Sequence, residues 1–225
     1  MNTKKLKNLV KKAKSELSWT IQETAQESGP LRIFSDPVAR THTIFTPSAP
    51  PEGGVSEELN YLHELGHALL CEQVHPFFSN GFPIAGLDKA QVPAVSPVLC
   101  AASDWFVGHW LMEFCPEVAI DELQKEYDAT AGIMEKGGPA SVDKFFVAVL
   151  IIAQAIKYLN MPVECSGILD MAVKAFLAVP PEKPSLRKIE NLINSLLSLG
   201  PPFQCRHISK EGQDVLEFYK TSEAA

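Results

Sequence analysis

The sequence has no cysteine arrangement that would form a disulfide framework. Its five cysteines are scattered, odd in number and never spaced as C-x-x-C; they are Cys71, Cys100, Cys115, Cys165 and Cys205. Domains that depend on disulfides usually carry an even number of cysteines at regular spacings. Because disulfides persist mainly in oxidising compartments, this cysteine usage predicts a reduced protein of the cytoplasm.

A long hydrophobic run and an excess of positive charge are also missing. The longest apolar stretch, residues 145–156, is too short to span a bilayer and contains Gln154. Residues 1–19 are rich in lysine but lack the apolar run of a signal peptide, and we interpret these lysines as a solvated helix face. The formal net charge of −7 argues against a general nucleic-acid binder, because phosphate contacts need a concentrated positive surface. We therefore expect a soluble, cytoplasmic protein whose partner is neither a membrane nor a nucleic acid.

The most informative stretch that is present is NYLHELGHALL, residues 60–70, which contains the pattern H-E-x-x-H. Residues four apart lie on the same face of an α-helix, so the imidazoles of His63 and His67 can converge on one Zn²⁺ ion per chain. Glu64 then points beside the ion, where it can accept a proton from metal-bound water without being a ligand. Burying two histidines and a glutamate in this apolar helix is costly unless a metal satisfies them. The alternative is that His63 and Glu64 are exposed and His67 is a hydrogen-bonded core residue.

A catalytic zinc usually takes three protein ligands and leaves a fourth position for water. We expect the third ligand to be Asp104, the only charged residue on a helix face that otherwise carries Pro97, Cys100, Ala101, Gly108, Leu111 and Cys115. A buried carboxylate needs a cation or several hydrogen-bond donors, and Gly108 would let this helix approach the motif helix closely. Alternatively, Asp104 caps a neighbouring element or pairs with a lysine or arginine. The third donor would then come from Glu113, Glu117 or Cys100.

A second catalytic residue is predicted on another face of the same helix. His109 could reach over the cleft and stabilise a developing oxyanion, a role that is also open to Tyr61, His75 and Tyr127. We assign this role to His109, beside Glu64 as the catalytic base.

Hydrophobic periodicity and turn signals predict an α+β fold that is mostly α. A helix over residues 4–27 precedes two strands, residues 31–34 and 41–46, which form a small antiparallel sheet with His42 at the surface. The motif helix covers residues 56–73 with Ser56 as its N-cap, and the loop over residues 77–97 is interpreted as a rim or lid of the cleft. Further helices are predicted over residues 98–114, 116–136, 141–159, 165–178, 185–199 and 210–220.

The segment HELGHALL resembles the active-site helix of the zincin metallopeptidases, and the later SDWFVGHWLM resembles the ImmA/IrrE group of this class. The resemblance implies His63 and His67 as zinc ligands and Glu64 as the base. The ImmA/IrrE helix carries a ligand Glu where this chain has Ala102, followed by a small residue and an Asp or Asn. This departure suggests that Asp104 has taken the ligand role. The aspzincins likewise use an Asp followed four residues later by Gly, the spacing of Asp104 and Gly108.

These observations predict one structural unit with two parts. Residues 1–115 would form a zincin-like metallopeptidase core that includes the N-terminal amphipathic helix, and residues 116–225 would form a helical bundle packed on that core. The predicted function is zinc-dependent hydrolysis of peptide bonds by metal-bound water, acting on a peptide or protein substrate that the resemblance implies is a specific regulatory protein. The alternative is a non-catalytic metal-binding or protein-interaction domain that retains the zincin helix. The sequence carries no prediction of oligomeric state.

Overall fold

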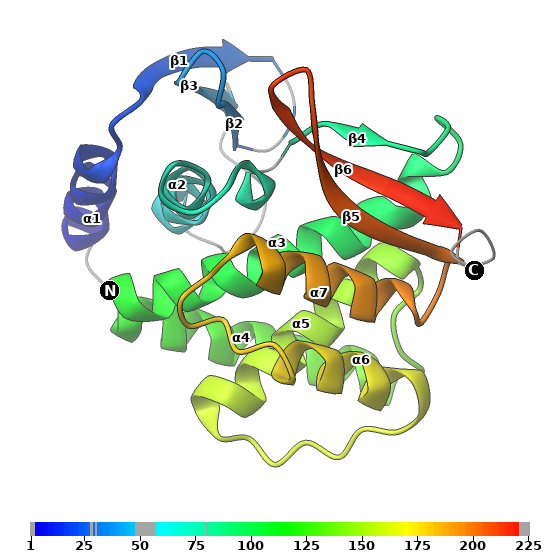
Figure 1. Ribbon diagram of the computed structural model, residues 1–225. Coiled ribbons are helices and arrows are strands. Elements are labelled where there is room, and N and C mark those ends of the chain that lie inside the picture. Colours follow the sequence, from blue (N-terminus) through cyan, green and yellow to red (C-terminus); the bar gives the residue numbers. More distant parts are fainter. Residues whose placement is uncertain (1–2, 28, 30, 48–56, 80, 221–225) are drawn as a thin grey trace.

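The computed structural model describes residues 3–27, 29, 31–47, 57–79 and 81–220, and within them the chain is a mostly helical α+β protein, as predicted (Figure 1). A first layer contains α1 (Thr3–Glu16), a sheet of β1 (Thr20–Gln26), β2 (Arg32–Asp36) and β3 (Thr41–Pro47), and the motif helix α2 (Glu57–Gln73). The short η1 (Pro76–Phe78) and β4 (Ile84–Ala85) lead into the central helix α3 (Val92–Phe114). The remaining elements are α4 (Pro116–Glu135), α5 (Val142–Leu159), α6 (Gly167–Leu177), α7 (Leu186–Leu197), β5 (Phe203–Lys210) and β6 (Gln213–Lys220).

The N-terminal sheet corrects the prediction of one helix over residues 4–27. The β2–β3 hairpin is antiparallel, as expected, but β1 pairs in parallel with β3, from Thr20 opposite Thr41 to Gln26 opposite Pro47. The sheet, in the order β1-β3-β2, is therefore mixed. The helical spacing of the apolar residues continues as far as Ile21, yet Thr20, Ile21 and Thr24 are β-branched and favour a strand. Pairing with β3 decides the conformation of this segment. Ser56, the expected N-cap of α2, lies outside the described residues.

His42 is buried, which corrects its expected place at the surface. Its side chain has no exposed area, its Nδ1 lies 2.8 Å from the Ser35 hydroxyl, and its Nε2 lies 2.8 Å from a carboxylate oxygen of Glu72 on α2. The same carboxylate accepts the backbone N–H groups of Ser18 and Trp19 at 2.9 Å. The Glu72 side chain is only 5% exposed, so it fixes the end of the motif helix against the chain entering β1 and against β3.

We expect Glu72→Gln to lower the free energy of unfolding by about 3 kcal/mol. The two oxygens of this buried carboxylate now accept hydrogen bonds from several donors, and the amide nitrogen of glutamine could not accept any of them. Burial alone would raise the pKa of Glu72, but hydrogen bonds from Ser18, Trp19 and His42 outweigh it and lower the pKa. The stability that this depressed pKa contributes is complete above the unfolded pKa of about 4.3 and is lost as the pH falls below it. Urea unfolding at pH 7 and pH 3.5 should therefore show a smaller loss on acidification in Glu72→Gln than in the wild type.

The matched control for this prediction is Glu57→Gln, at the exposed start of the same helix. Removing a charge there affects only the interaction with the helix dipole, which is worth less than about 1 kcal/mol. Equal losses of stability in the two variants would contradict the role given to Glu72.

The segment predicted as a loop forming a rim or lid of the cleft, residues 77–97, instead contains η1, β4 and the start of α3. Phe77 and Phe78 in η1 have no exposed area and anchor the segment in the core. The helix α3 begins at Val92, earlier than the predicted residue 98. Pro93 lies in its first turn, where backbone N–H groups have no hydrogen-bond partner within the helix, so the missing N–H of proline costs nothing there. Pro97 lies inside the helix and is buried. The several prolines thus mark the start of a long helix in addition to the loop before it.

The C-terminus corrects the prediction of a helix over residues 210–220. Helices α4 to α7 form as expected, but β5 and β6 pair antiparallel from Phe203 opposite Lys220 to Lys210 opposite Gln213. Glu211 and Gly212 connect them with φ of 53° and 79°. Two successive positive φ values are the geometry of a tight hairpin turn whose twist matches that of the strands. The strand β4 adds in parallel to β6.

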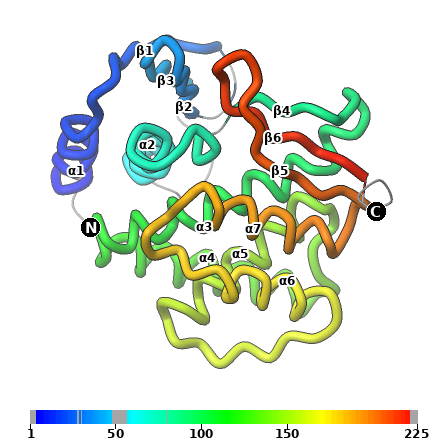
Figure 2. The backbone as a smooth tube through the Cα atoms, in the orientation of Figure 1, coloured from blue at the N-terminus to red at the C-terminus, as the bar shows by residue number. Residues whose placement is uncertain are grey.

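One hydrophobic cluster extends from Leu6 in α1 to Phe218 in β6, and α3 runs through its middle in contact with α2, α5 and α7 (Figures 1 and 2). Gly66, inside the H-E-x-x-H motif, is essential to this packing. A Cβ atom at Gly66 would lie 2.9 Å from both Val107 and Trp110 of α3. The missing side chain therefore lets α2 and α3 approach closely, which brings Asp104 opposite the motif histidines. No helix among the described residues has the length and hydropathy needed to cross a bilayer.

Candidate metal centre

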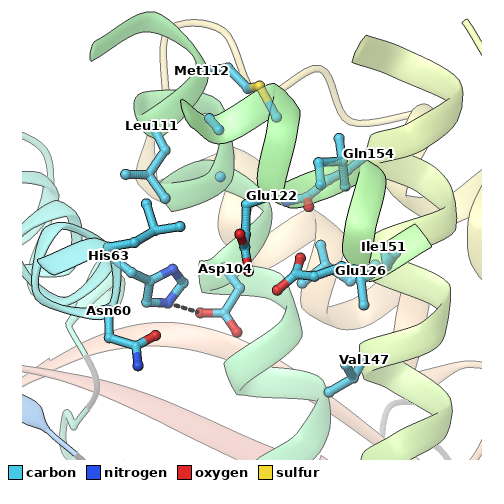
Figure 3. Close-up of a pocket in the computed structure, with 15 residues that line it drawn as sticks. Asn60, His63, Asp104, Leu111, Met112, Glu122, Glu126, Val147, Ile151 and Gln154 are labelled. Atoms are coloured by element: carbon cyan, nitrogen blue, oxygen red, sulfur yellow. Dashed lines mark ion pairs between the residues drawn. The ribbon is translucent and has the colours of Figure 1, made fainter. Parts of the chain in front are cut away.

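The structure brings together the three residues that the sequence predicts as zinc ligands. The Nε2 atoms of His63 and His67 are 3.2 Å apart, and the Oδ1 atom of Asp104 lies 3.3 Å from the first and 3.1 Å from the second. Figure 3 shows the approach of His63 to Asp104. Donors bound at about 2.0 Å in a tetrahedron are separated by about 3.3 Å. The triangle of donor atoms therefore has the size that a tetrahedral zinc ion requires.

The hydrogen bonding of His67 also suits a metal ligand. Its Nδ1 lies 2.7 Å from the backbone carbonyl oxygen of Phe78, so that nitrogen carries the proton and donates it. The other ring nitrogen, Nε2, faces His63 and Asp104, and it can offer its lone pair to a metal ion that takes the place of a proton there. A backbone carbonyl that orients the remote nitrogen is the usual support for a zinc-bound histidine. The His67 side chain is only 1% exposed, so η1 fixes this ligand from within the core.

The pKa values of His63 and Asp104 indicate that a proton now occupies the position a metal cation would take. Burial alone would raise the pKa of Asp104, but hydrogen bonds from His63 and His67 hold it well below its usual range. Burial alone would lower the pKa of His63, but its hydrogen bond to Asp104 and the charges of Asp104 and Glu64 raise it. A proton shared by these groups therefore stabilises the carboxylate. A divalent cation can take the place of that proton, since zinc binding releases protons from its ligands.

Comparison with family models, curated proteins and solved structures finds no match to this chain. The resemblance to the zincins therefore depends on the residues of the motif. At the position of the ImmA/IrrE ligand Glu, Ala102 is fully buried and absent from the donor group. The carboxylate in the group that could hold a metal is that of Asp104, two residues later, which faces the histidines of α2.

The predicted base Glu64 lies outside the group of donor atoms. One of its carboxylate oxygens accepts the backbone N–H of Ile33 in β2 at 2.6 Å. The strand β2 is at the edge of its sheet, so this bond joins the motif helix to an edge strand. The charge of Glu64 contributes to the raised pKa of His63, so its carboxylate lies near that residue without belonging to the group.

The other candidates lie elsewhere. The Nδ1 of His109 is 3.0 Å from the Tyr158 hydroxyl, its Nε2 is 3.4 Å from Glu113, and neither His109 nor Glu113 belongs to the donor group. Glu117 pairs with Lys5 at the surface, and the exposed Cys100 is likewise not a donor. Of the three further oxyanion candidates, Tyr61 bonds to Glu23, His75 belongs to a separate group, and Tyr127 is not among the residues that line the pocket beside His63 and Asp104.

That separate group contains His75, His207 and Asp214, where the β5–β6 hairpin meets the end of α2. Asp214 lies 2.7 Å from His207 and 3.5 Å from His75. The Nδ1 of His75 accepts the backbone N–H of Phe77, so its Nε2 carries the proton and faces Asp214 as a donor. Because a metal needs the lone pair on that nitrogen, this tautomer favours a hydrogen-bonded network, in contrast to that of His67.

A pocket of about 220 Å³ opens beside His63 and Asp104. Its far wall carries three polar residues that the sequence did not mark as site residues, Glu122 and Glu126 of α4 and Gln154 of α5 (Figure 3). The spacing of the two glutamates places them on one helix face, and Gln154 interrupts an apolar run. These signals were present in the sequence, but nothing in it indicates that α4 and α5 face the motif helix.

Proposed function

We propose that the protein is a zinc-dependent metallopeptidase that cleaves a peptide or protein substrate. The observation that carries the proposal is the triangle of donor atoms from His63, His67 and Asp104, in which the buried His67 presents the correct nitrogen. These three residues would hold one zinc ion and leave a coordination position open. Zinc, when bound there, lowers the pKa of a water molecule and polarises a carbonyl group.

The remaining steps belong to side chains of this protein. Glu64 would accept the proton released by the attacking water and pass it to the leaving amine. For this it must exchange its bond to the Ile33 N–H for one to the water. Its charge acts on His63, so the carboxylate lies near that ligand. The edge strand β2 lies next to Glu64, where the backbone of an extended substrate could add to the sheet.

The Glu64–Ile33 bond also supports the second candidate, a metal-binding domain without catalysis. If the carboxylate keeps this bond, it serves to attach β2 to α2 and is not available as a base. The two functions make opposite predictions for a protein that is already loaded with zinc.

We expect the zinc-loaded protein to cleave members of a mixed library of unstructured peptides, detected by mass spectrometry as new termini. Protein stripped of metal by a chelator should cleave none, and readdition of zinc should restore cleavage at the same bonds. Zinc-loaded protein that leaves the whole library intact would favour the metal-binding domain.

A further inference from the structure

The pocket beside the donor atoms combines apolar walls with negative charge (Figure 3). Glu122 and Glu126, one turn apart on α4, line it together with the donor Asp104. No lysine or arginine lines it among the residues that the structure describes. Its apolar walls come mainly from α3 and α5, through Leu111, Val147, Leu150 and Ile151. A volume of about 220 Å³ suits one long side chain.

Gln154 supplies an independent indication of a ligand. It is only 8% exposed, its side chain lines the pocket, and its amide forms no hydrogen bond with any residue in the described part of the chain. The amide atoms keep some contact with solvent in the pocket, so they carry no desolvation penalty, and a ligand that enters the mostly apolar pocket can form a hydrogen bond with them. Gly108 makes room for it, because a Cβ atom there would lie 2.1 Å from the Gln154 Nε2. The spacing of Asp104 and Gly108 thus places the zinc donor and the Gln154 amide along one pocket.

Glu126 is the second group that has no hydrogen-bond or salt-bridge partner. Glu122 has a neighbouring lysine, Lys125, at 3.3 Å, whereas Glu126 has neither a hydrogen bond nor an ion pair within the described residues. Glu126 is exposed where it lines the pocket, and the protein around it together with the charges of Glu122 and Asp104 raises its pKa, while the charge of His63 lowers it. A cation in the pocket would add to the charge of His63 in offsetting the effects that raise this pKa.

We propose that this pocket receives the side chain of a substrate lysine or arginine next to the bond that is cleaved. The cationic end would pair with Glu126 and Glu122, and the amide oxygen of Gln154 would accept one of its N–H groups. The methylene groups would contact Leu111 and Ile151, as long basic side chains do on apolar surfaces. This inference depends on the proposed function, because the pocket selects a residue only if the metal site cleaves a peptide.

The test uses two zinc-chelating compounds, Nα-acetyl-lysine hydroxamate and Nα-acetyl-norleucine hydroxamate, which differ only in the terminal ammonium group. We expect calorimetry on zinc-loaded protein to show about tenfold tighter binding of the lysine compound, a factor that corresponds to about 1.4 kcal/mol. The ratio should fall toward one in Glu126→Gln and in the double variant Glu122→Gln/Glu126→Gln. It should stay at the wild-type value in Glu135→Gln, an exposed glutamate at the end of the same helix.

Zinc content, measured on every sample, separates this inference from the proposed function. Equal binding of the two compounds to the wild type, or a preference that survives in the double variant, would overturn the inference and leave the metallopeptidase proposal intact. Loss of zinc in Glu126→Gln would overturn it by making Glu126 a ligand. Zinc-loaded wild type that binds neither hydroxamate would instead overturn the proposed function, because no coordination position would be open.

Discussion

His67→Ala is expected to reduce the zinc content from about one ion per chain in the wild type to almost none. The variant removes the ligand whose Nδ1 is fixed by the Phe78 carbonyl and leaves only two donors. Loss of a supporting residue alone typically lowers metal affinity by about 10 to 100-fold, so loss of a ligand should cost more. Asp104→Ala should have the same effect, because it removes the only negatively charged donor in the group. Elemental analysis of untagged protein, dialysed against limiting zinc, measures both.

The control variants for zinc content are Glu113→Ala, Cys100→Ala and His75→Ala, which change residues outside the donor group. Each should keep its zinc. Zinc that survives in Asp104→Ala but not in His67→Ala would move the third ligand to Glu113, Glu117 or Cys100. A wild-type protein that takes up no zinc after reconstitution would leave the interaction-domain function standing.

Glu64→Gln is expected to keep its zinc and to lose at least about 100-fold in peptide cleavage, the usual contribution of a positioned general base. Glutamine cannot take a proton from water, but its amide oxygen can still accept the Ile33 N–H, so the attachment of β2 to α2 should survive. The rate of cleavage of a peptide selected from the library gives the first readout, and zinc content gives the second.

The control for catalysis is Glu57→Gln on the same helix, an exposed change that should leave cleavage unchanged. Cleavage that persists in Glu64→Gln would show that another group is the base. Loss of zinc together with cleavage would show that Glu64 supports the metal site itself, and the catalytic role would then be wrong.

The helix that carries the metal donors could be predicted because its signals are local. The spacing of His63 and His67 fixes their common face, and the lone charge at Asp104 on an apolar face of α3 indicated a partner across the helix interface. The convergence of these three residues is what the structure shows. The wall of the pocket formed by Glu122, Glu126 and Gln154 could not be predicted, because it depends on how α4 and α5 pack.

The errors in secondary structure have the same cause. Residues 20–26 carry a partly helical pattern, but they pair with β3, which lies about twenty residues further along the chain. The C-terminal segment becomes β6 because β5 precedes it, and the turn at Glu211 and Gly212 allows the two to pair. His42 can be buried because its ring nitrogen Nε2 is hydrogen-bonded to the carboxylate of Glu72, which lies on another element. In each case a tertiary contact overrides a weak local preference.

The position of the donors along the chain has a consequence for protein synthesis. His63, His67 and Asp104 all precede the segments that complete the pocket, which extend to Gln154. Since the ribosome delivers the chain from its N-terminus, the donors emerge before α4 and α5 exist. If the protein binds zinc as proposed, its donors are therefore made before the wall that would select a substrate. Under the proposed function, selection of a substrate side chain would have to wait until α4 and α5 have been made and have packed.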